Sequence, residues 1–364
     1  MTPDGILDSA PEGLPLDPPD PPTPALPSVA PPLADPVSLT PLDARTGYAR
    51  ANGLRYAETD GVWDLTLGAA VNAPGGSGDA TSLADLARSL LPLELRGLIP
   101  TSGYLGTATF ETPQVAFAYE RGWRDSFARA GFPGPDEEFE LARAKLLPHA
   151  ANGVLLDASC GSGLFSRRFA KSGEYGAVIA LDFSDAMLRQ ARRFARDEGL
   201  LGGDDDEAED SGPGPSTTSP LTFVRADIAR LPFPSGTIAG VHAGAAIHCW
   251  PDPRSALAEV ARVMTPGASF CGTTFLTPRV PFADDQAQRA IDAAMREVQD
   301  AVAGRAGGAR GFRMWNKLDL KELCVDSGLV DFECDERGGF IFFAAKKPPA
   351  YEEPEDEAYR PTEI

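Results

Sequence analysis

The chain has 364 residues, 43% of them hydrophobic, which is enough for one large domain or a domain with attachments. Its formal net charge of −20 argues against a nucleic-acid partner, because phosphate binding needs a basic face. Most of that charge lies in three stretches, 1–45, 204–210 and 351–364, so the acidity says little about a ligand. No apolar run is long enough to predict a transmembrane segment, and the first residues predict neither a secretory signal nor a transit peptide.

The cysteines and histidines predict no metal site. Five cysteines are scattered without a Cys-x-x-Cys pair, and three histidines lack the spacing of metal ligands. We therefore expect no disulfide framework and a reducing compartment, the cytoplasm where no organelle is indicated.

The N-terminal 150 residues predict three segments. Residues 1–45 contain 13 prolines and predict a disordered acidic tail. Residues 46–110 predict a small segment of strands and loops, and residues 111–150 a helical lid. Within the lid, three aromatic residues share one helix face at i, i+4, i+8 spacing: Tyr119, Trp123 and Phe127.

From residue 151 to 347, strands alternate with helices. Seven apolar runs predict strands: 154–158, 177–182, 221–225, 238–243, 268–275, 329–335 and 339–346. Helices are expected at 164–172, 185–197, 253–264, 284–303 and 316–326. This order predicts an α/β fold: a Rossmann-like, seven-stranded, mostly parallel sheet with helices on both faces and an antiparallel C-terminal strand pair. Residues 199–220 predict a disordered insertion, and residues 348–364 an acidic tail.

The stretch "VLLDASCGSG" at 154–163 runs from a buried strand into a turn. In a parallel sheet, ligands bind at the carboxyl ends of the strands, and this turn brings five residues there: Asp157, Ala158, Ser159, Gly161 and Gly163. Glycines let the backbone approach a ligand closely. A carboxylate at the strand tip is a poor neighbour for a pyrophosphate and a good one for a cation.

Two further carboxylates follow the next two strands. Asp182 is placed to accept hydrogen bonds from both hydroxyls of a ribose, each worth roughly 1.5–3 kcal/mol. Asp227 suits an adenine amino group, with Ile228 packing on the ring. These positions predict a nucleoside that carries a cationic amino acid, and S-adenosylmethionine fits that description. We assign Phe183, Met187 and Gly244, which follow the second and fourth strands, to the same site.

The ordered motifs "VLLDASCGSG", "ALDFSDAMLRQAR", "RADIARLPFPSG" and "HAGAAIHCWPDP" resemble those of class I S-adenosylmethionine-dependent methyltransferases. They are similar to the branch of quinone methyltransferases, and "YERGWRDSFARAGFPGPDEEFELA" resembles uncharacterised plant and algal enzymes of chloroplasts. The resemblance covers residues 110–347. It implies S-adenosylmethionine as cofactor, a small lipophilic or quinone- or phenol-like acceptor, and a chloroplast location. Peripheral association with lipid is compatible with such an acceptor, and no oligomeric state follows from the sequence.

The chain departs from that family pattern at two places. Ser159 stands where the glycine-rich turn of the family begins with a glycine. The region of "PLDARTGYARANGLRYAETDGVWDLT" has no cysteine, whereas plant members carry a zinc-ribbon-like segment there. We therefore predict no zinc in this segment.

His248, after the fourth strand, is our candidate for the general base, because a histidine with an ordinary pKa suits a phenol or an acidic carbon. The fourth strand lacks the Asn/Asp-Pro-Pro-aromatic turn of amino-methylating enzymes, which favours a small-molecule acceptor. Two alternatives stay open. One is a non-catalytic S-adenosylmethionine-binding scaffold, and the other is a nicotinamide-dependent oxidoreductase with the same topology.

Overall fold

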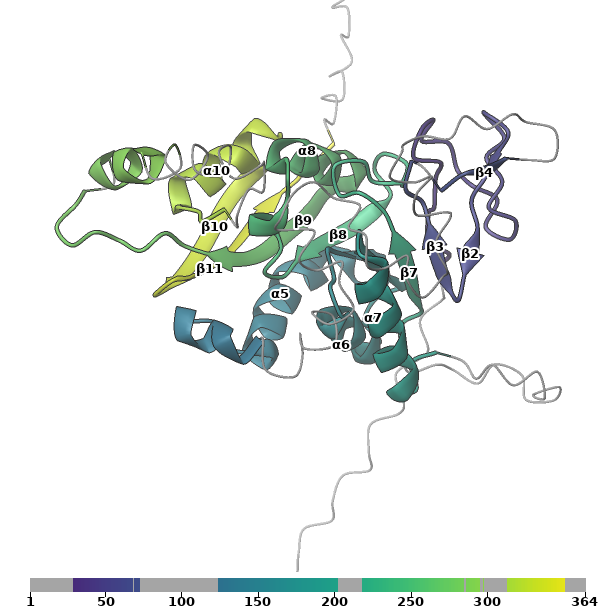
Figure 1. Ribbon diagram of the computed structural model, residues 1–364, viewed down its shortest axis with the longest axis horizontal. Coiled ribbons are helices and arrows are strands. Elements are labelled where there is room, and N and C mark those ends of the chain that lie inside the picture. Colours follow the sequence, from purple (N-terminus) through teal and green to yellow (C-terminus); the bar gives the residue numbers. More distant parts are fainter. Residues whose placement is uncertain are drawn as a thin grey trace, which may run out of the picture.

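The computed structural model describes residues 29–72 apart from 68, 124–201, 218–297 apart from 285, 295 and 296, and 313–350. One sheet of nine strands runs through this part of the chain, with helices on both of its faces (Figure 1). From one edge to the other its strands are β10 (Val330–Arg337), β11 (Phe340–Lys346), β9 (Met264–Phe275), β8 (Ile238–Ala243), β5 (Val154–Ala158), β6 (Ala177–Asp182), β7 (Leu221–Arg225), β3 (Val62–Asp64) and β2 (Glu58–Thr59). A separate small sheet pairs β1 (Leu54–Arg55) with β4 (Val71–Asn72).

The six strands from β9 to β3 lie parallel to one another, whereas β11 runs antiparallel to both of its neighbours. Apart from β3, which the N-terminal segment adds beyond β7, the chain begins the parallel set at the central strand β5, moves outward to β6 and β7, and returns to the other side at β8. Strand order therefore reverses between β5 and β8, and such a reversal opens a crevice at the carboxyl ends of the strands.

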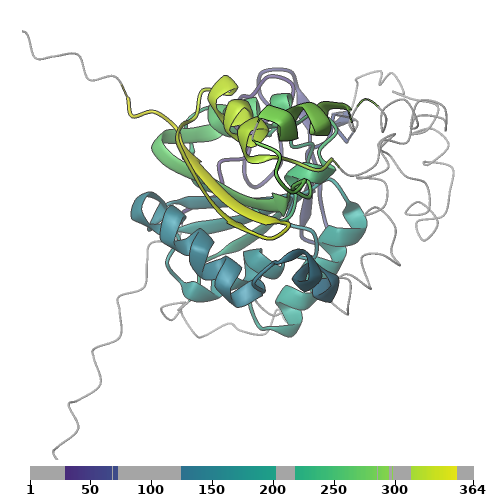
Figure 2. The ribbon, with the colours of Figure 1, turned by 90° about the vertical axis from the view of Figure 1, so that its left-hand side faces the viewer.

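Helices cover both faces of the sheet, as Figure 2 shows. The helices are η2 (Arg124–Ala130), α5 (Pro135–Ala150), α6 (Leu164–Ser172), α7 (Asp185–Asp197), η3 (Ile247–Cys249), α8 (Pro253–Val263), residues 286–294 and α10 (Lys317–Asp326). Residues of α5 and α6 share one hydrophobic cluster with Leu155, and residues of α8 and α10 share another with Leu156. Adjacent residues of one strand thus face opposite layers, as the pleat requires.

The predicted Rossmann-like α/β fold is confirmed, with two strands more than expected. Strands β5 and β6 and helices α6 and α7 have the predicted bounds, and the Ser184 side chain caps α7 by accepting the Met187 N–H. The additional strands are β2 and β3, a hairpin from the N-terminal segment. Strand β3 pairs in parallel with β7, so a segment expected to be separate extends the sheet.

Residues 29–45 correct the prediction of a disordered tail, because they pack against the domain. Leu33 and Leu42 are buried in the core cluster, and the Ala34 N–H donates to the Pro232 carbonyl over 2.8 Å. The carboxylate of Asp35 is fully buried and accepts from the Tyr56 hydroxyl over 2.6 Å. Proline content suggested disorder, but buried leucines and a satisfied carboxylate anchor this stretch. Residues 1–28 lie outside the described residues.

The helical lid predicted over 111–150 is also corrected in its C-terminal part. Helix α5 is a layer of the domain, since Ala142, Leu146 and Ala150 are fully buried against the sheet. Of the three aromatic residues predicted to share a helix face, Phe127 is described. It packs in the core, with its ring centroid 5.0 Å from that of Phe132. Tyr119 and Trp123 lie outside the described residues.

The predicted insertion 199–220 is ordered at both of its ends. Leu200 packs against hydrophobic clusters on the α6–α7 face. At the other end, Ser219 is buried and its N–H donates to the Ala170 carbonyl over 2.8 Å. Residues 202–217 and the tail from 351 onward lie outside the described residues.

Candidate functional site

The turn after β5 is built around two glycines in left-handed conformations. Gly161 has φ 56° and Gly163 has φ 75°, a region that L side chains rarely adopt. The Gly161 N–H donates to Oδ2 of Asp182 over 2.8 Å, which joins the turn to the end of the neighbouring strand. A Cβ on Gly163 would lie 2.9 Å from the Cβ of Ala191, so this glycine also lets α6 approach α7. Ala158, the residue before the turn, is fully buried in the core.

Asp157 lies beneath this turn and is sealed from solvent. Its side chain is 2% exposed, Oδ1 lies 2.7 Å from Nδ1 of His242, and Oδ2 accepts from the Ser166 hydroxyl. Strands β5 and β8 place Asp157 directly opposite His242 in their register. This carboxylate therefore fixes the base of the turn.

His242 is clamped between aromatic rings and a glycine. Phe165 and Phe169 present edges to the imidazole at centroid distances of 4.8 and 5.3 Å. A Cβ on Gly244 would lie 2.8 Å from Cε1 of His242. Gly244, predicted as a cofactor contact, is thus needed to make room for the histidine that holds Asp157.

Asp182 ends β6 and carries the electrostatic feature that most suits a ligand. It is half-buried, and besides Gly161 it accepts from the Ser184 N–H over 2.8 Å. Burial raises the pKa of Asp182 to about 6, and the charge of Asp157 adds to this, while hydrogen bonds from the backbone N–H groups of Ser184, Gly161 and Phe183 act in the opposite direction. A carboxylate whose charge is poorly solvated gains from any additional donor that a ligand supplies.

Ser159 adopts the conformation of a glycine. Its φ is 56°, and its hydroxyl accepts from Nε1 of Trp250 over 2.9 Å. The family pattern has a glycine at this position, so the indole hydrogen bond holds a backbone that the serine disfavours.

The residues predicted to contact adenine are not gathered at one surface. Asp227 is exposed and accepts from the Ala229 N–H of its own turn, whereas Ile228 packs in the core. Met187 is 1% exposed inside the domain. The Phe183 ring lies beside Asp182 and under the Arg225 guanidinium, 5.7 Å away. The cofactor contacts of these residues stay predictions, and Asp227 and Phe183, which was assigned to the site without a named contact, are the two that are not buried.

His248, the predicted base, is buried in η3. Its Nδ1 lies 3.1 Å from the Thr274 hydroxyl, and its ring packs 4.9 Å from that of Phe275. Burial lowers the pKa of His248 to about 4. The imidazole is therefore neutral at physiological pH and is a weaker proton acceptor than the ordinary histidine that we predicted.

Two thiols lie at the site, Cys160 within the turn and Cys249 in η3. Burial raises the pKa of both Cys160 and Cys249, and the nearby charge of Asp182 acts in the same direction. Both sulfurs are therefore protonated at neutral pH, which removes the thiolate needed for covalent catalysis.

Three residues that hold the turn were not predicted to be part of the site. They are His242, Trp250 and Ser166. The partners of His242 and Trp250, Asp157 and Ser159, lie 85 and 91 residues away in the chain, so no local spacing connects them.

No group of three potential metal ligands occurs within the described ranges. In the same ranges, none of the helices is both long enough and apolar enough to cross a membrane.

The chain was compared with known proteins. Residues 156–272 match a methyltransferase domain family. An uncharacterised chloroplastic methyltransferase of Arabidopsis thaliana is 42% identical over 244 residues, which are 66% of this chain and 60% of that protein. The demethylmenaquinone methyltransferase of Clavibacter sepedonicus is 30% identical over 169 residues, which are 46% of this chain and 58% of that protein.

Among solved structures, phosphoethanolamine N-methyltransferase 2 of Haemonchus contortus, in complex with S-adenosyl-L-methionine, aligns with a TM-score of 0.44. Its sequence is 17% identical, and the alignment covers 66% of this chain and 58% of that one. The chain spans about 60% of the length of the two Arabidopsis thaliana methyltransferases that it matches. The turn built on Asp157, Gly161 and Gly163 lies inside the range that matches the methyltransferase domain family.

Proposed function

We propose that the protein is an S-adenosylmethionine-dependent methyltransferase acting on a small, lipophilic or quinone- or phenol-like acceptor. The observation that carries the proposal is the link between the glycine turn and Asp182, within a domain that matches methyltransferases. At this link the glycine backbone can approach a ligand closely, and the Asp182 carboxylate can accept hydrogen bonds from the hydroxyls of an adenosyl ribose.

In this proposal each residue of the turn has a defined task. Asp182 accepts the ribose hydroxyls, and Gly161 and Gly163 leave space for the methionine part of the cofactor. Asp157 and Asp182 supply negative charge near the sulfonium, whose positive methyl-bearing sulfur is the activated group that the cofactor brings. The protein's main contribution is then to hold donor and acceptor in line, an effect worth roughly 7–11 kcal/mol.

The acceptor and the location are proposed from resemblance. The relatives include a demethylmenaquinone methyltransferase and proteins named as chloroplastic, which supports a quinone-like acceptor in a chloroplast. His248 remains our candidate for the base. Because its pKa is low, the imidazole is neutral at physiological pH and can accept a proton, but it binds that proton weakly.

A second candidate function is a cofactor-binding scaffold without catalysis. The buried, weakly basic His248 favours this alternative, because no other histidine of the site is placed as a base. Labelled S-adenosylmethionine incubated with the protein and a plastid lipid extract distinguishes the two. A labelled lipid product supports the enzyme, and tight cofactor binding without any product supports the scaffold. His248→Gln that turns over as fast as the wild type would remove this residue from the mechanism.

The nicotinamide alternative is tested by calorimetric titration. We expect S-adenosylmethionine to bind and NAD not to bind, since the turn lacks a third glycine at the dinucleotide spacing. Asp182→Asn should abolish most of the binding, and Asp185→Asn is the matched control, because Asp185 lies three residues away on α7 and pairs with Arg189. Tighter binding of NAD than of S-adenosylmethionine would overturn the proposal.

A further inference from the structure

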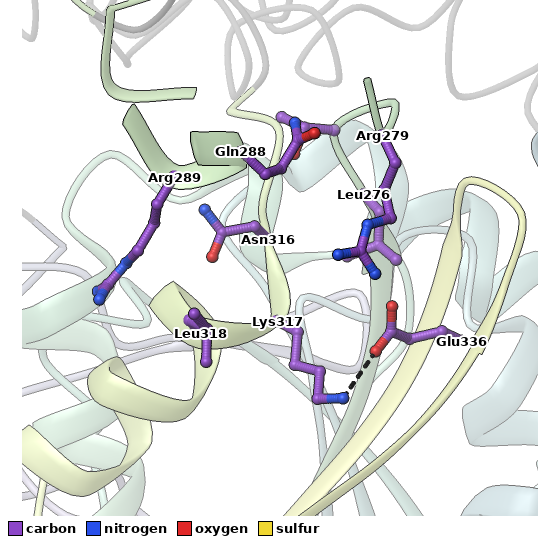
Figure 3. A pocket seen from close by; sticks show the side chains of 9 residues that line it. Leu276, Arg279, Gln288, Arg289, Asn316, Lys317, Leu318 and Glu336 are labelled. Carbon is purple, nitrogen blue, oxygen red and sulfur yellow. Dashed lines mark ion pairs between the residues drawn. The ribbon is translucent and has the colours of Figure 1, made fainter. Parts of the chain in front are cut away.

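A cavity of about 90 Å³ lies beyond the carboxyl end of β9. Figure 3 shows the residues that line it: Leu276, Thr277, Arg279, Gln288, Arg289, Asn316, Lys317, Leu318 and Glu336. They come from the segment after β9, the helical residues 286–294, the start of α10 and the end of β10. None of these residues belongs to the turn described above. A cavity of this size has room for a few waters or one small polar group.

Three polar residues of the lining donate hydrogen bonds to Asp292, which lies behind them and is not itself part of the lining. Asp292 is 1% exposed and accepts from the Thr277 hydroxyl (3.1 Å), Nε2 of Gln288 (2.9 Å) and Nδ2 of Asn316 (3.0 Å). Gln288 also accepts the Val280 N–H over 2.8 Å. These bonds tie together three chain segments that contribute to the lining.

The groups that face the cavity are mainly cationic. Its lining contains Arg279, Arg289 and Lys317, but only one acid, Glu336. Arg289 turns toward Glu322, outside the lining, whereas the guanidinium of Arg279 points into the space beside Lys317 and Glu336 (Figure 3). Lys317 and Glu336 form an ion pair at 3.2 Å. A ligand oxyanion would therefore meet two cationic heads and compete with the carboxylate of Glu336.

The cavity adjoins the candidate reaction centre through direct backbone and ring contacts. The ring of His248 packs on that of Phe275, the residue before Leu276 of the lining. The backbone carbonyl of His248 accepts the Arg313 N–H. The Trp315 N–H donates to the Phe275 carbonyl over 3.2 Å, and the Thr277 N–H to the Trp315 carbonyl over 2.7 Å. A molecule that extends from the cavity along β9 would reach the end of β8, which lies beside β5 and the glycine turn where the methyl donor is proposed to bind.

We propose that this cavity binds an anionic group, a carboxylate or a phosphate, carried by the methyl acceptor, with Arg279 and Lys317 as its ligands. The inference deepens the proposed function and rests on it: the acceptor is a lipophilic or aromatic molecule with one anionic end. Arginine and lysine both suit such oxyanions, arginine through paired donors and lysine as a point charge.

The test is calorimetric binding of three probes that share a phenyl ring: benzoate, phenyl phosphate and the neutral benzyl alcohol. The full chain is used, with and without saturating S-adenosylhomocysteine. We expect at least one anion to bind at least about tenfold more tightly than benzyl alcohol, an advantage that falls with added salt. The tighter of benzoate and phenyl phosphate identifies the headgroup. Equal binding of all three probes would overturn the proposal.

Three variants of the lining should change the affinity for the preferred anion in opposite directions. A general disturbance of the fold would weaken binding in all three. Arg279→Gln and Lys317→Gln should each weaken binding of the preferred anion by about tenfold, whereas Glu336→Gln should tighten it severalfold. The matched control is Arg254→Gln, which removes an arginine paired with Asp326 at the far end of α10 and should change the affinity by less than about twofold. Unchanged affinity in Arg279→Gln, or weaker binding in Glu336→Gln, contradicts the assignment.

Cofactor titrations separate failure of this inference from failure of the proposed function. The same variants should bind S-adenosylmethionine as the wild type does, because none of them belongs to the glycine turn. A wild type that prefers the anions but ignores S-adenosylmethionine refutes the methyltransferase function and leaves the anion site standing. A wild type that binds S-adenosylmethionine but shows no anion preference refutes only the anion site.

Discussion

The glycine turn and the cationic cavity hold their charges in opposite ways. At the turn, Asp157 is 2% exposed and lies between two protein donors. In the cavity, Lys317 is 54% exposed and Glu336 is 32% exposed, so water competes with their ion pair. A buried network defines one geometry and is costly to break, whereas solvated charges tune affinity in small steps. Under the proposed function, the first arrangement suits a site with one fixed cofactor, and the second suits a site that selects an acceptor.

The largest effect expected at the turn is that of His242→Leu. The leucine fills similar space but cannot donate, which leaves the buried Asp157 with the Ser166 hydroxyl as its remaining side-chain donor. We expect the free energy of unfolding to fall by about 3–5 kcal/mol, as measured by urea denaturation. The control His149→Gln alters an exposed histidine that contacts Thr265 and should change stability by less than about 0.5 kcal/mol. If both variants lose the same small amount, the buried pair does not hold the turn.

Gly163→Ala is the next largest effect, because it combines backbone strain with a clash. The added Cβ meets Ala191 at 2.9 Å while φ is 75°. We expect a loss of about 2–4 kcal/mol in urea denaturation. Gly199→Ala separates the two causes, since Gly199 has φ 71° but nothing within 4 Å of the new Cβ, and it should lose only about 1 kcal/mol. Equal losses would show that α6 and α7 adjust freely around the turn.

Asp182→Asn tests the cofactor side through binding. We expect affinity for S-adenosylmethionine to fall about 10- to 100-fold at pH 8, because a neutral amide accepts the ribose hydroxyls less strongly than a carboxylate. The pKa of Asp182 in the folded state is about 6, above the ordinary 3.8, so this carboxylate takes up a proton within the pH range of the experiment. The ligand's hydroxyl donors favour the charged form, which is the stronger acceptor. Affinity of the wild type should be constant above pH 7 and fall by up to about tenfold per unit below pH 6. The Asn variant should lose this pH dependence, and a wild type with a flat profile from pH 5 to 8 would exclude Asp182 from the ribose site.

The same pKa shift predicts how stability depends on pH without a ligand. Because the folded state holds the proton of Asp182 more tightly, its stabilising effect is complete below pH 4 and is lost as the pH rises through 6. The wild type should therefore lose up to about 3 kcal/mol relative to Asp182→Asn between pH 4 and 7. Paired urea titrations at the two pH values measure this difference, and an unchanged difference would contradict the raised pKa.

Local pattern was enough to predict the elements that carry the turn. Strands β5 and β6 and helices α6 and α7 begin and end where apolar runs, glycines and the Ser184 cap indicate. The partners of the turn could not be predicted in this way. The contact of His242 with Asp157 depends on β8 lying beside β5, and strand order is a property of the whole sheet.

Composition was misleading at the N-terminus for a related reason. Thirteen prolines in residues 1–45 indicated a disordered tail, but Leu33 and Leu42 are buried and the Asp35 carboxylate is satisfied by residues that follow it in the chain. Average composition does not show whether two apolar side chains find a core. The prediction of seven strands failed at the same segment, because β3 joins β7 across more than 150 residues.

The smallest effect concerns Ser159, where strain and a hydrogen bond oppose each other. Ser159→Ala keeps the left-handed backbone and loses the bond from Trp250, so we expect a loss of about 1 kcal/mol in urea denaturation. Ser159→Gly loses the same bond but removes backbone strain worth about 1–2 kcal/mol, so it should be more stable than the alanine variant by about 1 kcal/mol.

The hydrogen bond between Trp250 and Ser159 can also be tested by removing its donor, the Trp250 indole N–H. In a Trp250→Phe background the donor is already absent, and Ser159→Ala should then cost nothing further. An alanine variant as stable as the glycine variant would mean that the backbone at 159 is not strained. In that case the serine is an ordinary member of the turn, and the family's glycine at this position serves the cofactor rather than the chain.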